Sequence, residues 1–346
     1  MMTALVIAIL IVALIFNFTN GFHDAANAIA TSVSTRALSM RSALLMAAVM
    51  NIVGALLGTS VAHTIGSDIV SISYGTDEGN MIALIVVFAA LFSAIAWNLI
   101  TWWFGLPSSS SHALIGGLAG AGLACGLMVH WTSILDKVVI PMIVSPLGGF
   151  IVAYIAMIIV LRLCAALPYH RTMRRFRWAQ TVSAAAMALG HGLQDAQKTM
   201  GVMLIALTAG GFHSFEHGVP AWVKITAALT ISIGTYFGGT RIMATLGSKV
   251  IDLDPAHGFV AESVAAGFLY VAAMGFGAPV STTHTITTSI MGVGATKRLS
   301  AVRWGVAGDI VVAWVMTLPA AAAIAVALEA RTLLMLTDVE GLYSAW

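Results

Sequence analysis

The chain carries very little charge for its length. Of its 346 residues only 9% are Asp, Glu, Lys or Arg, whereas 59% are hydrophobic. Soluble domains are about 25% charged, and apolar stretches long enough to cross a bilayer recur throughout this sequence. The composition therefore excludes an ordinary soluble protein. The net charge of +2 is too small to indicate a nucleic-acid partner.

Cysteine is equally scarce. Cys125 and Cys164 both lie in apolar segments and have no partner spacing for metal or redox chemistry, so we expect them to be buried small residues. The segment from Met1 to Phe16 is apolar but has no basic region and no small-residue cleavage site. We interpret it as a first membrane span and not as a removable signal.

Two polar motifs each occur twice. Residues 104–112 read FGLPSSSSH, and residues 276–284, 172 positions later, read FGAPVSTTH. The segment Gly21–Ala25 reads GFHDA and returns 171 positions later as GLQDA at Gly192–Ala196. Polar, Gly-containing segments at matching places in two apolar halves are typical of transporters built from internal repeats.

Ten apolar stretches are candidate membrane spans, five in each half. They cover residues 3–19, 42–64, 81–104, 112–129, 138–164, 179–209, 221–244, 258–276, 284–296 and 304–328. Because five is an odd number, the two halves would have opposite orientations. We expect an all-α, polytopic membrane fold of two inverted-topology repeats, with about 10–12 transmembrane helices when broken and re-entrant helices are counted. The repeats would be residues 1–164 and 179–346, joined by a basic linker at 165–178.

The basic residues indicate the orientation. With an extracytoplasmic N-terminus, twelve of them fall in cytoplasmic loops and three outside. The twelve are Arg36, Arg41, Arg162, Arg171, Arg174, Arg175, Arg177, Arg241, Lys249, Lys297, Arg298 and Arg303, and the three are Lys137, Lys224 and Arg331. This positive-inside bias predicts a cytoplasmic linker and extracytoplasmic termini.

Asp24 and Asp195 lie in apolar segments, where an acidic side chain costs about 2.5–3.5 kcal/mol on insertion scales. Each has a polar residue at i+3, Asn27 and Lys198, which a helix would place on the same face. Such groups can simply hold membrane helices together by hydrogen bonds. Their duplication, together with the polar face, favours a functional role.

The Pro-Ser/Thr segments indicate an anion site. Pro107 and Pro279 end one helix and suit the first turn of the next. The hydroxyls that follow would then lie at a helix N-terminus among free backbone N–H groups, where an anion binds without a basic residue. They belong to Ser108, Ser109, Ser110, Ser111, Ser281, Thr282 and Thr283. Ordinary N-capping explains one hydroxyl in each run, but not a run of three or four.

The two motifs have complementary chemistry. Hydroxyls at helix N-termini favour an anion, and carboxylates favour cations or protons. A site that binds both together lowers the charge carried across the bilayer, which is a physical reason for symport. His23, His112 and His284 adjoin these motifs and could shuttle protons, bind metal or merely pack. Glu262, another acid in an apolar segment, is a candidate for the ion path. Lys198 could pair with Asp195 or contact the anion.

Residues 20–31, residues 191–201 and the two Pro-Ser/Thr-His segments resemble the inorganic phosphate transporter (PiT) family, and the resemblance extends across essentially the whole chain. It implies phosphate bound between the halves, alternating access, cotransport with protons or sodium, no cofactor, and a homodimer. The implied phosphate contacts are Ser109, Ser110, Ser111, Ser281, Thr282, Thr283, Asn27, Gln197 and Lys198. The implied ion-coupling residues are Asp24, Asp195, Asn20, Glu262 and His23.

Some residues depart from the usual family motif. His23 and Gln194 stand where the motif has Asn, and Asn51 stands where sodium-coupled eukaryotic members carry Glu. These features resemble the bacterial low-affinity subgroup of the inner membrane. That resemblance implies proton-coupled uptake of phosphate, alone or as a neutral complex with a divalent metal. Sodium coupling stays open.

Other functions are less consistent with the sequence. Sulfate is also a tetrahedral oxyanion, but it has no protons to donate to carboxylates. An anion channel would be hindered by paired acids in its path. A Ser-His hydrolase has no need of internal symmetry. We therefore expect a phosphate symporter and not an enzyme.

Overall fold

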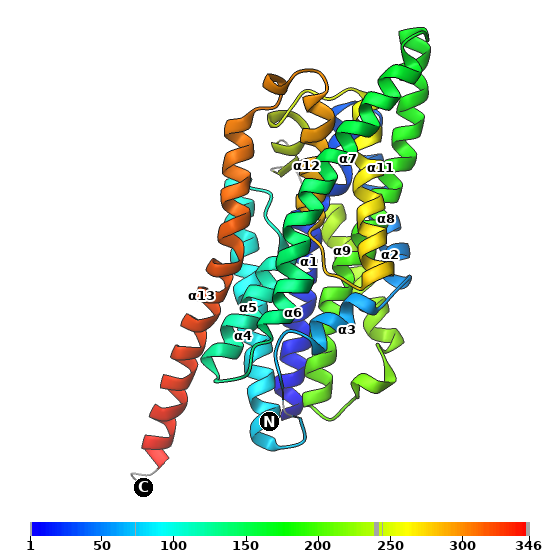
Figure 1. Cartoon of the computed structure of the whole chain (residues 1–346). Coiled ribbons are helices and arrows are strands. Elements are labelled where there is room, and N and C mark those ends of the chain that lie inside the picture. Colours follow the sequence, from blue (N-terminus) through cyan, green and yellow to red (C-terminus); the bar gives the residue numbers. More distant parts are fainter. Residues whose placement is uncertain (1, 73, 239–241, 244, 344–346) are drawn as a thin grey trace.

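The computed structural model describes the backbone of residues 2–72, 74–238, 242–243 and 245–343, and the side chains of these except 248–249 and 329–343. The expected all-α fold is confirmed (Figure 1). The helices are α1 (Met2–Ser34), α2 (Met40–Leu56), α3 (Ser60–Ser67), α4 (Asp77–Phe104), α5 (Ser110–Ala124), α6 (Trp131–Ile134), α7 (Ile140–Cys164), α8 (Tyr169–Ala209), α9 (Ala221–Phe237), α11 (Pro255–Tyr270), α12 (Thr282–Ala295) and α13 (Trp304–Tyr343). Short π-helical turns, η1 (Leu135–Val139), η3 (Thr245–Lys249) and η4 (Val271–Phe276), join or extend them.

The described residues contain five helical runs long and apolar enough to cross a membrane. They are α1, α4, the run from α6 to α7, the run from α11 to η4, and α13. A sixth is counted if α2 and α3, bent by 69°, form one broken span. By contrast, α5 and α12 contain only 15 and 14 residues. At 1.5 Å per residue each is about 20 Å long, too short for a hydrocarbon core of about 30 Å. The chain is a multi-pass membrane protein that contains half-length helices.

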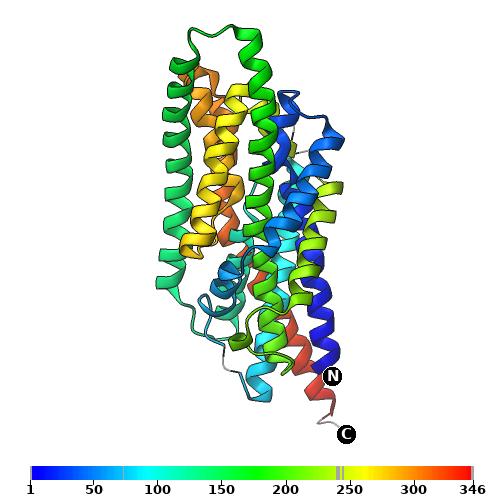
Figure 2. The ribbon, with the colours of Figure 1, turned by 90° about the vertical axis from the view of Figure 1, so that its right-hand side faces the viewer.

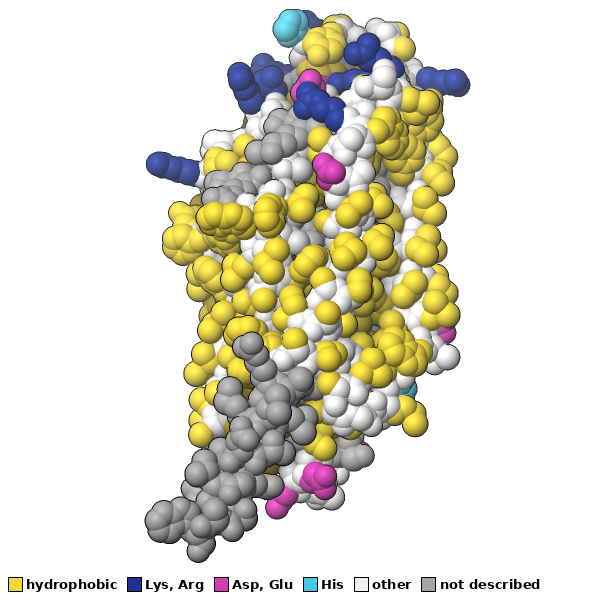
Figure 3. All heavy atoms as spheres, turned by 90° about the vertical axis from the view of Figure 1, so that its left-hand side faces the viewer, with side chains coloured by type: hydrophobic (Ala, Val, Ile, Leu, Met, Phe, Trp, Pro, Cys, Tyr) yellow, Lys and Arg dark blue, Asp and Glu magenta, His cyan; other side chains and the backbone are white. Residues whose placement is uncertain are grey.

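The outer surface has the distribution expected of a membrane protein. On the face shown in Figure 3, apolar side chains cover the middle, Lys and Arg gather at one end, and a group of acidic side chains lies at the other end. The basic end contains the junction of α7 and α8, and α1 begins at the opposite end (Figure 2). Arg241, and the side chains of Lys249 and Arg331, lie outside the described residues.

The two halves pack on each other by equivalent contacts. α1 and α8, which carry the two Asp motifs, run in opposite directions (Figure 2). α1 packs on α9, and its counterpart α8 packs on α2. In the same way α5 packs on α13, and its counterpart α12 packs on α7. Each half thus buries its central helices against the other half, as two intertwined repeats of opposite direction would.

The motif glycines allow these helices to touch. A Cβ on Gly21 would lie 2.2 Å from the carbonyl oxygen of Ile231 on α9, and a Cβ on Gly192 would lie 2.3 Å from that of Asn51 on α2. Small residues allow membrane helices to approach to backbone contact. The glycines therefore serve close packing, and α1 and α8 run through the Asp motifs without a break.

The expected single span at residues 42–64 is interrupted. Helix α2 ends at Leu56, and α3 begins at Ser60. The side-chain oxygen of Gln197 accepts hydrogen bonds from the backbone nitrogens of Val61 (2.8 Å) and Ala62 (3.4 Å). A side chain from α8 thus satisfies the first N–H groups of α3, which the sequence of α2 and α3 alone does not indicate.

Outside the membrane, Asp254 caps the N-terminus of α11. Its carboxylate accepts hydrogen bonds from the backbone nitrogens of Ala256 (3.0 Å) and His257 (3.1 Å) and lies 2.8 Å from His257 Nδ1. Lys297 Nζ lies 3.6 Å from Asp254 Oδ2. Burial by itself would raise the pKa of Asp254, but the hydrogen bonds and charge of His257, with the charge of Lys297, outweigh it and lower the pKa to about 2.

Candidate functional site

The two Pro-Ser/Thr segments form two helix tips of similar structure. Gly105 and Gly277 end the preceding helices with φ of 67° and 58°, in the left-handed region that glycine tolerates. Ser109 caps α5 by accepting from the backbone nitrogen of His112 (3.3 Å), and Ser281 caps α12 by accepting from that of His284 (3.2 Å). Capping accounts for one hydroxyl in each run, so the remaining hydroxyls need another explanation.

The tips meet at the centre of the protein. The rings of His112 and His284, one turn into each helix, have centroids 4.9 Å apart. His284 stacks on Trp314 at 4.0 Å, and Trp314 Nε1 donates to the carbonyl oxygen of Pro107 (2.8 Å). These contacts hold the N-terminal turns of α5 and α12 side by side.

Asp24 lies between the two tips and is only 1% exposed. Ser110 of the α5 tip donates to its Oδ2 (3.3 Å), and Thr283 of the α12 tip donates to its Oδ1 (3.5 Å). Asn27, one turn later on α1, donates to Thr283 Oγ1 (2.8 Å). His23 Nδ1 lies 2.6 Å from Asp24 Oδ1. The first Asp motif is therefore joined to both hydroxyl runs.

Asp195 is fully buried on the facing side, on α8. Lys198 Nζ lies 2.8 Å from its Oδ1, and His191 Nε2 lies 3.2 Å from its Oδ2. Lys198 Nζ also donates to Ser110 Oγ (3.2 Å). Ser110 thus bridges the two Asp motifs, because it contacts Asp24 with one hydrogen bond and Lys198 with the other.

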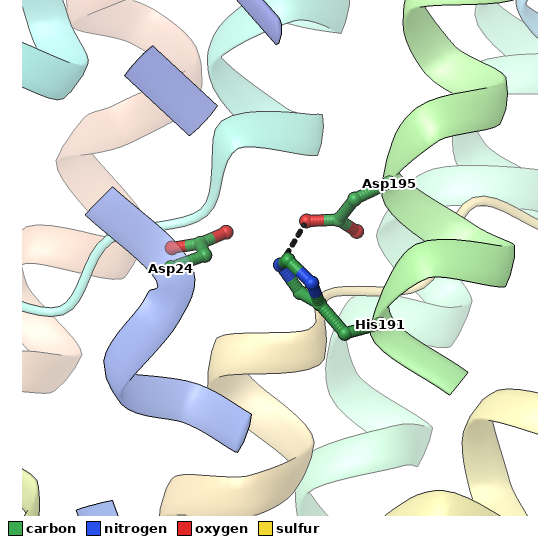
Figure 4. Close-up of side chains that lie close together, drawn as sticks. All are labelled: Asp24, His191 and Asp195. Atoms are coloured by element: carbon green, nitrogen blue, oxygen red, sulfur yellow. Dashed lines mark ion pairs between the residues drawn. The ribbon is translucent and has the colours of Figure 1, made fainter. Parts of the chain in front are cut away.

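Three of these side chains form a group able to hold a cation. Ligand atoms of Asp24, His191 and Asp195 all lie within 4.8 Å of one another, and the three side chains point toward one another from α1 and α8 (Figure 4). His191 was not among the predicted site residues. Its position four residues before Asp195, on the same helix face, was the available signal. Its other nitrogen, Nδ1, lies 3.0 Å from Asn51 Oδ1.

Other predicted residues lie within this region without such contacts. Ser111 and Thr282 are buried on the tips, and within the described part of the chain Ser111 Oγ has no hydrogen-bond partner. Asn20 is fully buried on α1, one turn before Asp24, and its side chain makes no hydrogen bond to any described residue. Their predicted roles stay predictions.

Two predicted residues are engaged elsewhere. Gln197, predicted to contact phosphate, uses its side-chain oxygen on the start of α3 and its nitrogen on the carbonyl oxygen of Leu193 (2.8 Å). Glu262 lies in a second buried cluster, where Thr31, Gln180 and Ser183 donate to it. The structure therefore brings neither side chain into hydrogen-bonding contact with the Asp24–Asp195 cluster.

Comparison with known proteins identifies the family of the chain. A model of the phosphate transporter family matches residues 20–325. A Rhizobium meliloti protein named probable low-affinity inorganic phosphate transporter is 49% identical over 323 residues, which cover 92% of this chain and 94% of that protein. A Bacillus subtilis protein of the same name is 43% identical, with the same coverage of both chains.

A solved structure titled the sodium-dependent phosphate transporter has a TM-score of 0.85. The match covers 96% of this chain and 99% of that one at 23% identity, which shows the same fold. The family model and the relatives, which extend over most of the sequence, concern transporters and not enzymes. On this evidence of sequence and fold together, the chain belongs to the phosphate transporter family.

Proposed function

We propose that this protein is a secondary active symporter that imports inorganic phosphate together with protons. The observation that carries the proposal is the meeting of two hydroxyl-lined helix tips and two acidic side chains in one buried cluster. The family and the names of the Rhizobium meliloti and Bacillus subtilis relatives support phosphate as the substrate.

Phosphate would bind at the tips of α5 and α12. The hydroxyls of Ser110, Ser111, Thr282 and Thr283 and the free N–H groups of two helix N-termini offer donors to its oxygens. The buried ammonium of Lys198 adds a positive charge beside Ser110. A carboxylate such as Asp24 accepts a hydrogen bond only from a phosphate that still carries a proton, and this favours phosphate over sulfate.

The coupling ion would be taken by the acids. His23 Nδ1 lies 2.6 Å from Asp24 Oδ1, which is within proton-transfer distance of the carboxylate. The group of Asp24, His191 and Asp195 offers one nitrogen and two carboxylates, a ligand set suited to a divalent cation that enters with phosphate. Sodium is the alternative coupling ion, since carboxylate oxygens bind it as well.

The surroundings of the cluster support alternating access. Asp24, Asp195 and Lys198 are at most 1% exposed, so substrate reaches them only when the helices move. Thr31, which contacts Glu262, lies seven residues after Asp24 on α1, about 10 Å along the axis toward the basic end. We propose that Glu262 lies on the ion path. The basic end would lie on the cytoplasmic side of a bacterial inner membrane, and both termini would lie on the opposite side.

Uptake of labelled phosphate into proteoliposomes tests the proposal. A proton gradient, a sodium gradient and added magnesium would be applied separately, with sulfate as competitor. We expect accumulation driven by the proton gradient and little competition by sulfate. Accumulation driven only by sodium would identify sodium as the coupling ion, and no accumulation under any gradient would refute symport.

A further inference from the structure

The two Asp motifs differ at one position in charge. The segments align with a shift of 171 residues, so Asn27 of the first half corresponds to Lys198 of the second. Lys198 is 1% exposed and lies on α8. A buried ammonium in a membrane is costly and needs a negative charge nearby. The neutral amide at the equivalent place needs only hydrogen bonds.

The two side chains nevertheless make equivalent contacts. Asn27 donates to Thr283 on α12, in the opposite half, at 2.8 Å. Lys198 donates to Ser110 on α5, again in the opposite half, at 3.2 Å. Each therefore connects its Asp motif to the hydroxyl tip of the other repeat. The difference is that Lys198 also supplies a positive charge 2.8 Å from Asp195 Oδ1.

The charge balance of the cluster follows from these contacts. Asp24 and Asp195 contribute two negative charges and Lys198 one positive charge. Among the described residues, the other titratable groups near these charges are His23 beside Asp24, His191 beside Asp195, and His112, which interacts with the charge of Lys198. With these histidines neutral the cluster has one uncompensated carboxylate. A cluster with an amide in both motifs would have two, and each buried carboxylate requires a cation or a proton.

We propose that Lys198 is a tethered cation that takes the place of one coupling ion. Because Lys198 compensates the charge of Asp195, the cluster needs one mobile positive charge in each cycle and not two. Lys198 thereby determines how many positive charges accompany each phosphate. This inference rests on the proposed function, and it adds a residue that sets the coupling ratio.

The test is Lys198→Asn, which copies the residue of the first half. The charge moved per phosphate would be measured from the reversal potential of uptake in proteoliposomes at fixed pH. We expect the variant to move one more positive charge per phosphate than the wild type, because Asp195 then needs its own sodium ion or proton. Lys198→Arg keeps the positive charge and should keep the wild-type charge per phosphate. Ser232→Ala, a buried serine of α9 outside the cluster, is the control and should keep the wild-type value as well.

The outcomes separate the inference from the proposed function. If the wild type moves no phosphate, symport itself is refuted. If the wild type is active and Lys198→Asn moves the same charge per phosphate, the tethered-cation role is overturned. If Lys198→Asn is folded but inactive, its thermal unfolding midpoint is compared in sodium chloride, in choline chloride and at lower pH. Stabilisation by sodium or acid beyond that of the wild type supports the inference, and its absence overturns it.

Discussion

Removal of the Ser110 hydroxyl should weaken phosphate binding strongly. Its oxygen lies 3.3 Å from Asp24 Oδ2 and 3.2 Å from Lys198 Nζ, at the N-terminal turn of α5. A hydrogen bond to a charged group contributes about 1.5–3 kcal/mol, and about 1.4 kcal/mol corresponds to a factor of ten in affinity. If this hydroxyl binds phosphate, Ser110→Ala should raise the apparent KM by about 10- to 150-fold.

The assay is uptake of labelled phosphate by proteoliposomes over a range of concentrations under a constant proton gradient. The number of coupling ions per phosphate should change little, because both carboxylates remain. Thr282→Ala on the second tip should have the same kind of effect. Ser232→Ala is the matched control, since this serine is also buried, on α9, and donates to the carbonyl oxygen of Ala228 (2.7 Å) outside the cluster. An unchanged KM in both tip variants would show that these hydroxyls serve only the helix ends.

Three further predictions concern other parts of the molecule. Asp24→Asn and Asp195→Asn should abolish gradient-driven uptake and leave the protein folded, as judged by its elution profile in detergent; normal accumulation by both would remove the acids from the mechanism. Gly192→Ala should lower the Tm, because the new methyl group meets backbone at 2.3 Å and overpacking costs about 1–3 kcal/mol, whereas Gly267→Ala, which meets no atom within 4 Å, should not. Asp254→Ala should lower the free energy of unfolding by about 1 kcal/mol through loss of the helix cap. Because the pKa of Asp254 in the folded protein is lowered to about 2, the difference in Tm between wild type and variant should shrink as the pH falls from about 4 toward 2. A difference independent of pH would contradict this.

Much of the architecture follows from local signals in the sequence. Apolar stretches predict helices in a membrane, and the repeated Gly-Leu/Ala-Pro and Ser/Thr residues predict two helix ends followed by two new helix starts. The structure has these ends at Gly105 and Gly277 and these caps at Ser109 and Ser281. Such features depend on residues within one turn of each other, so spacing is sufficient to recognise them.

Other features could not be recognised by spacing. At the break between α2 and α3, the backbone nitrogen of Val61 donates to Gln197 Oε1, which is 136 residues away in the sequence. The family resemblance implied that Gln197 contacts phosphate together with Lys198. On a helix adjacent residues point in directions about 100° apart, so Gln197 and Lys198 meet different partners.

The sequence by itself determined that the protein lies in a membrane and that an acidic motif and a hydroxyl-rich helix start each occur twice, because these are patterns of residue type along the chain. Only the tertiary structure decided which motifs meet. Ser110 contacts Asp24 of its own half and Lys198 of the other, and ligand atoms of Asp24, Asp195 and His191 lie within 4.8 Å of one another. The physical reason is that periodicity determines which face of a helix is polar, whereas the packing of one half against the other determines what that face touches.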